Sequence, residues 1–286
     1  MSAFFGLDIG STQVKVMQAG KNNQGLTVEK FALVETNPKN QVMAIKQAIK
    51  EAGIKGTAEV NVALAESEVY SKIIDTPKLS EAELASSIQY EAEQYIPVAL
   101  SEIELFHQVL AIQEGDNEKV MKVLLIAVPK ERINSLLSLV DQAGLIPKSL
   151  ETELFSVKRL FNKEDKVQIL VSCGYKTTDL MILNKAIPVF NYSVNVGGLA
   201  LTKSLMNELN LSVDQAEEYK KTYGMRTDLL EGKIAKILTL VVDEIVSQIN
   251  KAMLFLQQQN FNKPPEELIL AGGGALLPGL SAYLAA

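Results

Sequence analysis

The sequence contains few of the residues that build disulfides, zinc sites and nucleophilic triads. Its 286 residues include one cysteine, Cys173, one histidine, His107, and no tryptophan. A single cysteine cannot form a disulfide within the chain, and this usage is typical of a reducing cytoplasm. One histidine and one cysteine are also too few for a His/Cys zinc site. A Ser-His-Asp triad would need His107, which lies in an alternating strand pattern, so we interpret it as solvent-facing or part of an interface.

The sequence also lacks a concentrated basic charge and a long apolar run. Lysine and arginine number 28 against 34 aspartate and glutamate residues, which gives a net charge of -6 and a pI near 5.1. A nucleic-acid surface needs a concentrated basic face, so we expect no nucleic-acid partner. No apolar run approaches the ~20 residues that cross a bilayer, and the segment before Asp8 is too short for a signal peptide. We therefore expect membrane contact only through a partner.

The stretch from Gly6 to Lys15, GLDIGSTQVK, organises the rest of the interpretation. An apolar strand carries Asp8 near its end, Gly10-Ser11-Thr12 turns the chain, and alternation then resumes, which indicates a β-hairpin. The N–H groups of such a turn can cradle a phosphate, and Gly10 permits close approach because it has no Cβ. Asp8 can hold Mg²⁺ through water. Taken alone, the stretch equally fits a tight surface hairpin with an incidental aspartate.

Two later stretches extend this design. Residues 167–180 form a second strand–turn–strand, VQILVSCGYKTTDL, so the chain contains an internal duplication. Near the end, residues 268–275, LILAGGGA, run a strand into three glycines, with a helix start expected after them. These three elements, in this order, resemble the first phosphate, second phosphate and adenosine motifs of the actin/sugar-kinase/heat-shock-chaperone ATPase superfamily.

Periodicity, caps and turn residues divide the chain. The pattern predicts helices over 41–52, 80–95, 129–143, 153–161, 213–223 and 229–260. Two strands, around 104–112 and 119–128, are predicted between the second and third of these helices. Residues 78–145 therefore form a compact α-β-β-α unit, and polar residues 162–166 mark a boundary. We predict lobe 1 at 1–162 (core 1–77 and 146–162, inserted subdomain 78–145) and lobe 2 at 163–286, with a reduced small subdomain around 210–245.

The superfamily resemblance implies an α/β actin-like ATPase fold, with two lobes around a cleft that binds ATP and Mg²⁺. The implied nucleotide-binding positions are Asp8 (also the water-mediated Mg²⁺ ligand), Gly10, Ser11, Thr12, Gln13, Lys15, Gly174, Tyr175, Lys176, Thr178, Gly197, Gly198, Glu217, Lys220, Gly272, Gly273 and Gly274. Glu217 and Lys220 also fit an ordinary solvated helix face. The second phosphate motif usually opens with an aspartate that organises Mg²⁺ and the attacking water, but here that position is Ser172. A neutral hydroxyl cannot take that role, so we expect nucleotide binding with weak or absent hydrolysis.

The inserted subdomain indicates a more specific resemblance within this superfamily. Residues 78–145 lie where FtsA-like proteins carry their inserted subdomain, and residues 90–97, YEAEQYIP, are similar to the signature of the PilM family, cytoplasmic actin-like proteins of type IV pilus machines. That resemblance covers nearly the whole chain. It implies a cytoplasmic protein held at the inner face of the cell membrane through PilN, whose N-terminal cytoplasmic tail lies in a groove between the main and inserted subdomains of lobe 1.

The resemblance also implies contact with other pilus platform and motor proteins, and self-assembly. Tyr95 and Ile96 are predicted to support the groove, with helix-end packing as the alternative. An FtsA-like division protein and a small-molecule kinase of the same superfold remain alternatives. A division protein would carry a C-terminal amphipathic helix, for which residues 281–286 are too short, and a kinase would need a catalytic base that the sequence does not suggest. Seven residues follow Gly279, where the family normally adds a strand and a helix, so we interpret the C-terminus as short.

Overall fold

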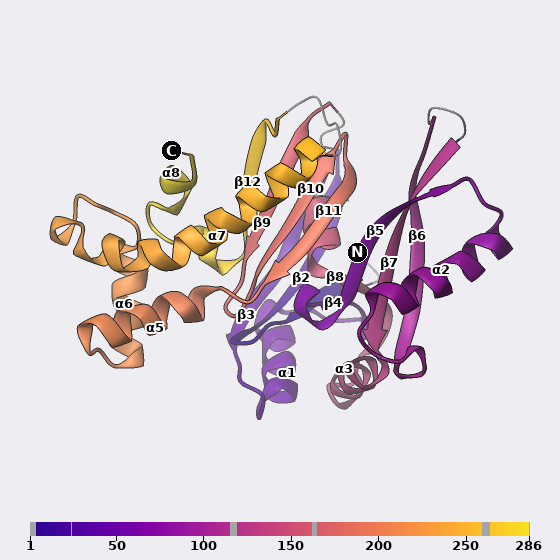
Figure 1. Cartoon of the computed structure of the whole chain (residues 1–286). Coiled ribbons are helices and arrows are strands. Elements are labelled where there is room, and N and C mark those ends of the chain that lie inside the picture. The colour runs from indigo at the N-terminus through magenta and orange to yellow at the C-terminus, as the bar shows by residue number, and fades with distance from the viewer. Residues whose placement is uncertain (1–3, 24, 115–118, 162–164, 259–263, 286) are drawn as a thin grey trace. The chain divides into compact units, whose positions relative to one another are not determined.

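The computed structural model describes residues 4–23, 25–114, 119–161, 165–258 and 264–285 (Figure 1). The chain divides into two compact units, residues 1–156 and 157–286, which we call unit 1 and unit 2. The predicted lobe limits, 1–162 and 163–286, stay a prediction. The predicted boundary segment 162–166 lies partly outside the described residues.

Unit 1 is built on a five-stranded sheet with the order β3-β2-β1-β4-β8. Alternating apolar residues give it one buried face, to which Leu7, Val14 and Val16 contribute. Strands β1, β2 and β3 are antiparallel, whereas β4 runs parallel to both β1 and β8. The strands are β1 (Phe5–Ile9), β2 (Gln13–Asn22), β3 (Gly25–Glu35), β4 (Glu59–Leu64) and β8 (Ile146–Thr152).

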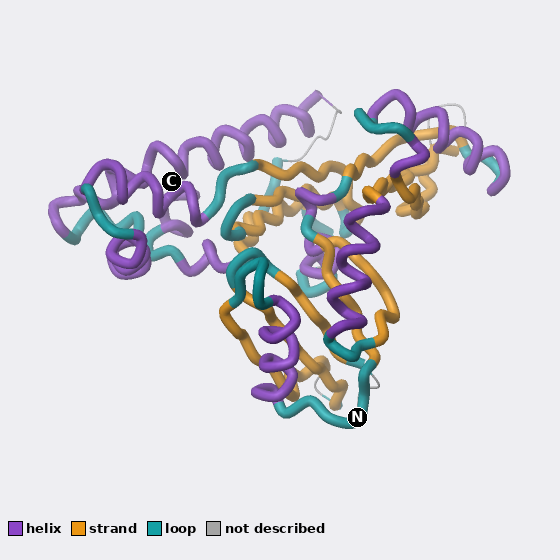
Figure 2. Tube along the Cα trace, turned by 90° about the horizontal axis from the view of Figure 1, so that it is seen from below, coloured by secondary structure: helices purple, strands orange, loops and turns teal. Residues whose placement is uncertain are grey.

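Two helices cover the buried face of this sheet. Helix α1 (Gln41–Ala52) has the predicted bounds, and Gly53 ends it in the left-handed conformation, with φ 65°. Helix α3 (Lys130–Gln142) places Leu136 and Val140 in the same core. The two helices lie side by side in the view from below (Figure 2). Residues from α1 and α3, which are distant in the sequence, therefore belong to one core.

A second sheet in unit 1 has the order β5-β7-β6 (Figure 1). Leu84 and Ile88 of α2 pack on Met121, Val123 and Leu125 of β7. A capping box begins α2, because the side chains of Ser80 and Glu83 each accept a hydrogen bond from the other residue's backbone N–H. The elements are η1 (Glu66–Glu68), β5 (Tyr70–Pro77), α2 (Glu81–Tyr95), η2 (Leu100–Glu102), β6 (Ile103–Glu114) and β7 (Lys119–Pro129).

The predicted subdomain 78–145 is tied to its surroundings at both ends. Strand β5, which precedes residue 78, pairs with β7 along its whole length. The last helix of the predicted subdomain, α3, belongs to the core of the main sheet. Both connections join segments that are distant in the sequence, so the local sequence pattern did not indicate either of them.

Unit 2 is a four-stranded sheet with the order β11-β10-β9-β12, crossed on one face by the long helix α7 (Figure 1). Strand residues such as Ile169 and Leu180 share a core with Leu238 and Val242 of α7. The strands are β9 (Val167–Cys173), β10 (Thr178–Asn184), β11 (Ile187–Val194) and β12 (Glu267–Ala271). The helices are α5 (Gly198–Leu209), α6 (Val213–Tyr223), η3 (Leu230–Gly232), α7 (Lys233–Gln258), η4 (Gly273–Leu276) and α8 (Leu280–Ala285), and α4 (Glu153–Lys158) precedes them.

Two predicted helix limits are wrong. Helix α7 begins at Lys233 rather than at residue 229, because Leu230, Glu231 and Gly232 all have positive φ, which a right-handed helix cannot contain. Helix α4 ends at Lys158 rather than at residue 161, because the chain tightens there into turns in which N–H groups bond three residues back. The predicted end of the long helix, at residue 260, lies outside the described residues.

Candidate functional site

The first glycine turn lies in unit 1, between β1 and β2. The Gly10 N–H donates to the Gln13 carbonyl over 2.9 Å, and a Cβ on Gly10 would lie 3.0 Å from that oxygen. Asp8 and Lys15 are partners in the ladder, and Lys15 Nζ lies 2.7 Å from Asp8 Oδ2. The predicted hairpin is therefore present, and its aspartate is partly exposed beside a lysine.

The second glycine turn, in unit 2, repeats this geometry. The Gly174 N–H donates to the Thr177 carbonyl over 2.8 Å, and a Cβ on Gly174 would again lie 3.0 Å from the accepting oxygen. The agreement supports the predicted duplication at the level of backbone geometry. Within this turn Lys176 is exposed, whereas Thr178 is buried and its hydroxyl donates to the Val196 carbonyl over 2.7 Å.

The start of α5 is seated on the second turn. The Gly198 N–H donates to the Gly174 carbonyl over 3.0 Å, and the Leu199 N–H donates to the Tyr175 carbonyl over 2.8 Å. A Cβ on Gly197 would lie 2.8 Å from both of those carbonyl oxygens, so this position requires glycine. The glycine pair thus holds the helix against the turn. The predicted nucleotide-binding role of Gly197 and Gly198 stays a prediction, and the Gly198 N–H donates here to the Gly174 carbonyl.

Lys220 of α6 completes this arrangement. Its ammonium donates to Glu217 Oε1 over 2.6 Å, to Thr202 Oγ1 over 2.8 Å and to the Gly198 carbonyl over 3.2 Å. An ammonium has three protons, so all are used. Lys220 is 9% exposed, which excludes the solvated-face alternative for this residue.

Glu217 is charged within this network. Burial acts to raise the pKa of Glu217, but the hydrogen bonds from Lys220 and Thr202, with the charges of Lys220 and Lys221, outweigh it, so this pKa lies below its usual range. Thr202 also donates to Glu217. The sequence analysis missed Thr202, which lies one turn into α5 and faces α6.

The three glycines after β12 are not equivalent. A Cβ on Gly272 would collide with the Cys173 carbonyl, and one on Gly274 would lie 2.5 Å from the Cys173 Cβ. Gly272 also has φ 77°. These two glycines therefore let the turn pack against the end of β9, where burial raises the pKa of the Cys173 thiol to about 11. Apart from its chain neighbours, a Cβ on Gly273 would have no heavy atom within 4 Å, so a ligand can come close to the backbone at this position.

The structure thus brings most of the predicted residues of unit 2 together. Gly174 contacts the start of α5, α5 contacts Lys220 of α6, and the end of β9 contacts the glycines after β12. A buried carboxylate beside them, Asp179, was missed by the sequence analysis. Its signal was available, because counting from Gly174 places it opposite Ser172 in the hairpin.

The residues predicted for the partner groove lie at the end of α2. Tyr95 is the last residue of this helix and is 51% exposed, and the Lys72 ammonium lies over the face of its ring. Ile96 follows at the C-cap and is half-buried, and its N–H donates to the Ala92 carbonyl. Both the groove role and the helix-end role remain compatible with these positions.

A model of the family described as type IV pilus assembly protein PilM matches residues 6–286. The chain belongs to the PilM family. The structure is similar to that of a PilM–PilN type IV pilus biogenesis complex, with a TM-score of 0.84 and 25% identity, covering 99% of this chain and 85% of that one. The fold prediction and the family resemblance are therefore confirmed.

More distant similarities agree with the actin-like fold. The chain is 24% identical over 328 residues to the cell division protein FtsA of Enterococcus hirae, covering 97% of this chain and 74% of that protein. MreB5 of Spiroplasma citri bound to AMPPNP has 15% identity and a TM-score of 0.53, covering 98% of this chain and 87% of that one. Within the described ranges, no helix of this PilM-family protein is both long enough and apolar enough to span a membrane.

Proposed function

We propose that this PilM-family protein binds ATP with Mg²⁺ and also binds the N-terminal cytoplasmic tail of PilN, which holds it at the inner face of the cell membrane. The observation that carries the proposal is the similarity of nearly the whole chain to the PilM–PilN complex. Contacts with other pilus platform and motor proteins, and self-assembly, belong to the same proposal. The experiment that tests it is calorimetric titration of the full chain with ATP-Mg²⁺ and, separately, with a synthetic PilN tail peptide.

The two glycine turns support nucleotide binding. In each turn the glycine N–H donates to the carbonyl three residues later. The similar structures of MreB5 are bound to AMPPNP and to ADP. In this proposal the turns at Gly10 and Gly174 receive the phosphates, the α5–α6 network of Glu217 and Lys220 supports the ribose side, and Gly273 lies beneath the base. Saturable ATP binding is the expected result, and its absence would contradict this half of the proposal.

The donor set fits a hydrated Mg²⁺ rather than a metal caged by protein. Within the described residues, no three His, Cys, Asp or Glu side chains gather as ligands. Asp8 is a partly exposed carboxylate beside the first turn, which suits a contact through water. When bound, Mg²⁺ would neutralise phosphate charge. Because Ser172 stands where an acid is expected, we propose that ATP is held and turned over slowly.

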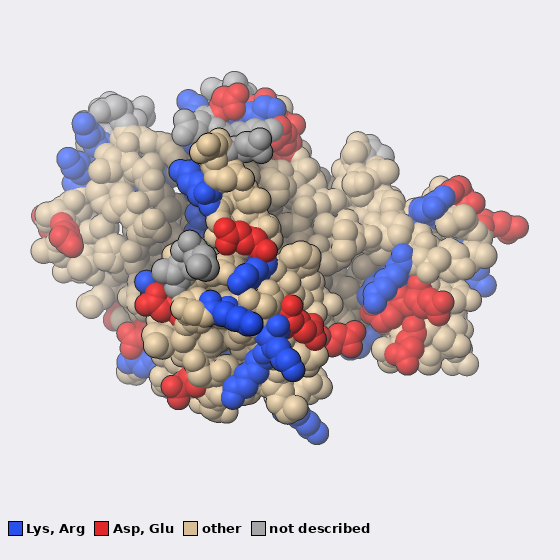
Figure 3. Space-filling view, turned by 180° about the vertical axis from the view of Figure 1, so that it is seen from behind, with Lys and Arg blue, Asp and Glu red and all other residues tan. Residues whose placement is uncertain are grey.

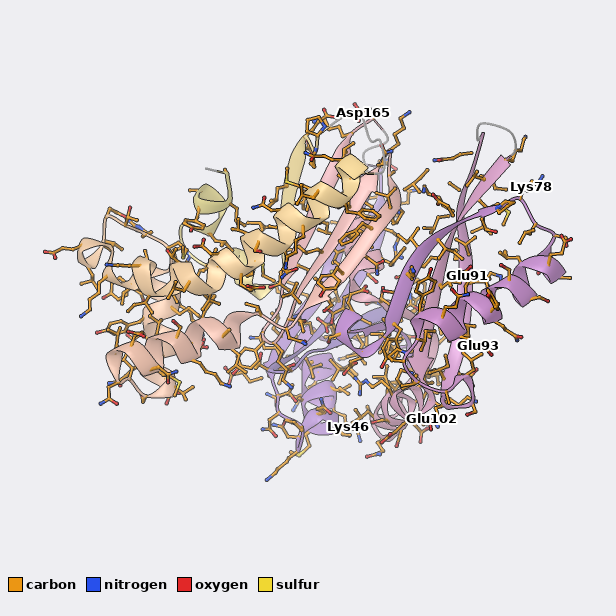
Figure 4. All side chains as sticks on the ribbon, in the orientation of Figure 1. Lys46, Lys78, Glu91, Glu93, Glu102 and Asp165 are labelled. Atoms are coloured by element: carbon orange, nitrogen blue, oxygen red, sulfur yellow. The ribbon has the colours of Figure 1, made fainter. Side chains whose placement is uncertain are left out.

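The end of α2 supports the peptide half of the proposal. Glu91 and Glu93 project from the C-terminal half of α2, and Glu102 comes from the segment after it (Figure 4). The face shown in Figure 3 carries both signs of charge, with a group of acidic side chains at the right of the view and a group of basic ones near the centre. A tail carrying Lys or Arg would be attracted to the acids near α2, and a few apolar side chains would supply affinity.

Point variants test the peptide site better than removal of residues 78–145, because α3 and β7 are part of the packing of unit 1. A labelled PilN tail should bind the full chain saturably. Tyr95→Ala should weaken that binding, whereas Tyr90→Ala, on the same helix and 65% exposed, is the matched control. Unchanged binding by Tyr95→Ala would place the peptide elsewhere, and equal weakening by both variants would contradict the specific role of Tyr95.

A further inference from the structure

Unit 2 contains a buried carboxylate that the proposed function does not use. Asp179 is the second residue of β10 and is 3% exposed. Leu180 and Ile182 face the apolar core with α7, and side chains alternate along a strand, so Asp179 lies on the opposite face of the sheet. Among the described lysines and arginines, none forms an ion pair with it. Such a group needs an explanation, because burying an unpaired charge is costly.

The two duplicated hairpins show what is unusual about its position. In the first hairpin, Asp8 lies two residues before the turn glycine and pairs in the ladder with Lys15, five residues after that glycine. In the second hairpin the same ladder position pairs Ser172 with Asp179. Each hairpin therefore has one carboxylate at this position. In the first it is on the leading strand, and in the second it is on the returning strand.

Ladder partners share a sheet face, with Cβ atoms about 4.5–5.5 Å apart. A carboxylate on residue 179 therefore reaches much of the space that one on residue 172 would reach. The side chain is also held in place, because the Ser193 hydroxyl on β11 donates to Asp179 Oδ1 over 2.5 Å. Burial raises the pKa of Asp179, while hydrogen bonds from Ser193 and Thr177 partly oppose that effect. A nearby cation would favour the charged form.

We propose that Asp179 supplies the carboxylate that the second phosphate turn lacks at Ser172, and that it acts on the Mg²⁺ complex of a bound nucleoside triphosphate. This inference rests on the proposed nucleotide binding. Ser172 provides a hydroxyl beside the carboxylate, and Ser193 orients it. In this proposal Asp179 supplies the Mg²⁺ contact from across the ladder, while position 172 itself still has no carboxylate to organise the attacking water.

The test is calorimetric titration of the full chain with ATP in Mg²⁺ and in excess EDTA. Asp179→Asn keeps the shape and can still accept from Ser193, so it removes the charge alone. Asp228→Asn, at an exposed site paired with Arg226, is the charge-matched control. All titrations are run below the measured unfolding transition of every variant.

In the wild type, Mg²⁺ should raise the affinity for ATP. In Asp179→Asn that gain should fall about tenfold or more, the scale of a lost charged contact, with little change in EDTA. The double variant Ser172→Asp/Asp179→Asn should recover the gain, because it returns a carboxylate to the same ladder position.

An undiminished Mg²⁺ effect in Asp179→Asn would overturn the inference. Loss in that variant without recovery in the double variant would also overturn it, because the two positions would not be interchangeable. A wild type that does not bind ATP in either condition would instead overturn the proposed function.

Discussion

Gly197 and Gly174 are in direct backbone contact, and a Cβ on residue 197 would lie 2.8 Å from the Gly174 carbonyl oxygen. Gly197→Ala should therefore force α5 away from the second glycine turn and destabilise the protein by about 1–3 kcal/mol, the usual cost of overpacking. Thermal or denaturant unfolding measures this change. Unaltered stability would show that α5 can move without loss.

Gly273→Ala is expected to behave in the opposite way. Its Cβ would enter open space, and Gly273 does not have positive φ, so stability should remain close to that of the wild type. If the nucleotide base lies over this residue, ATP affinity should nevertheless fall. Parallel unfolding and ATP titrations separate the two effects, and a stable variant with full ATP affinity would remove Gly273 from the proposed site.

Lys220→Met should destabilise the protein, with a loss of about 1–3 kcal/mol at neutral pH, because it leaves the partly buried Glu217 carboxylate without its cation. Lys221→Met is the matched control, because Lys221 is exposed and 3.9 Å from the other carboxylate oxygen. Urea unfolding of the two variants compares them. Equal effects would mean that burial of Lys220 contributes nothing.

The same network predicts a pH dependence. The folded-state pKa of Glu217 is lowered below its ordinary value of 4.5, so its contribution to stability is present above that value. The contribution is lost as pH falls from about 4.5 through the lower folded-state pKa. The wild type should therefore lose more stability than Lys220→Met over this acidic range. Parallel stability curves for the two proteins would contradict the role assigned to Glu217.

Asp8→Ala should weaken Mg²⁺-dependent ATP binding by more than ~1 kcal/mol, the scale of losing a charge-assisted contact. Lys15→Met is the companion variant, because it frees the Asp8 carboxylate from its ion pair without removing it. Calorimetric titration with ATP, with and without Mg²⁺, measures the affinity of each variant. Equal affinity of Asp8→Ala and the wild type for ATP-Mg²⁺ would exclude Asp8 from the site.

Hydrolysis should be slow despite nucleotide binding. Enzymatic turnover commonly runs at about 1–1000 per second, and we expect a rate far below that range because Ser172 cannot organise the attacking water as a carboxylate would. A steady-state phosphate-release assay measures the rate. Rapid hydrolysis that depends on Asp8 would contradict the expectation.

Local chemistry made the hairpins and several helices predictable. Gly10 and Gly174 lie in turns that require close backbone approach, and the capping residues Ser80 and Ser212 begin helices where the sequence indicates. These features depend on neighbouring residues only. The predicted start of α7 was wrong because nothing in the sequence indicated that Leu230 adopts positive φ.

The parts that sequence reasoning missed depend on contacts between distant residues. The pairing of β5 with β7 and the burial of Lys220 against α5 arise only when separate elements meet. The position of Asp179 was accessible from the hairpin register, but its burial and its bond to Ser193 were not. The predicted nucleotide and groove residues stay predictions.

The most direct test of the central claim is a fluorescence-anisotropy titration of a labelled PilN N-terminal peptide with the full chain. The account predicts saturable binding that Tyr95→Ala weakens and Tyr90→Ala leaves unchanged, because Tyr95 ends α2 beside Lys72 whereas Tyr90 lies five residues earlier on that helix. Absence of saturable binding by the folded wild-type protein would contradict it.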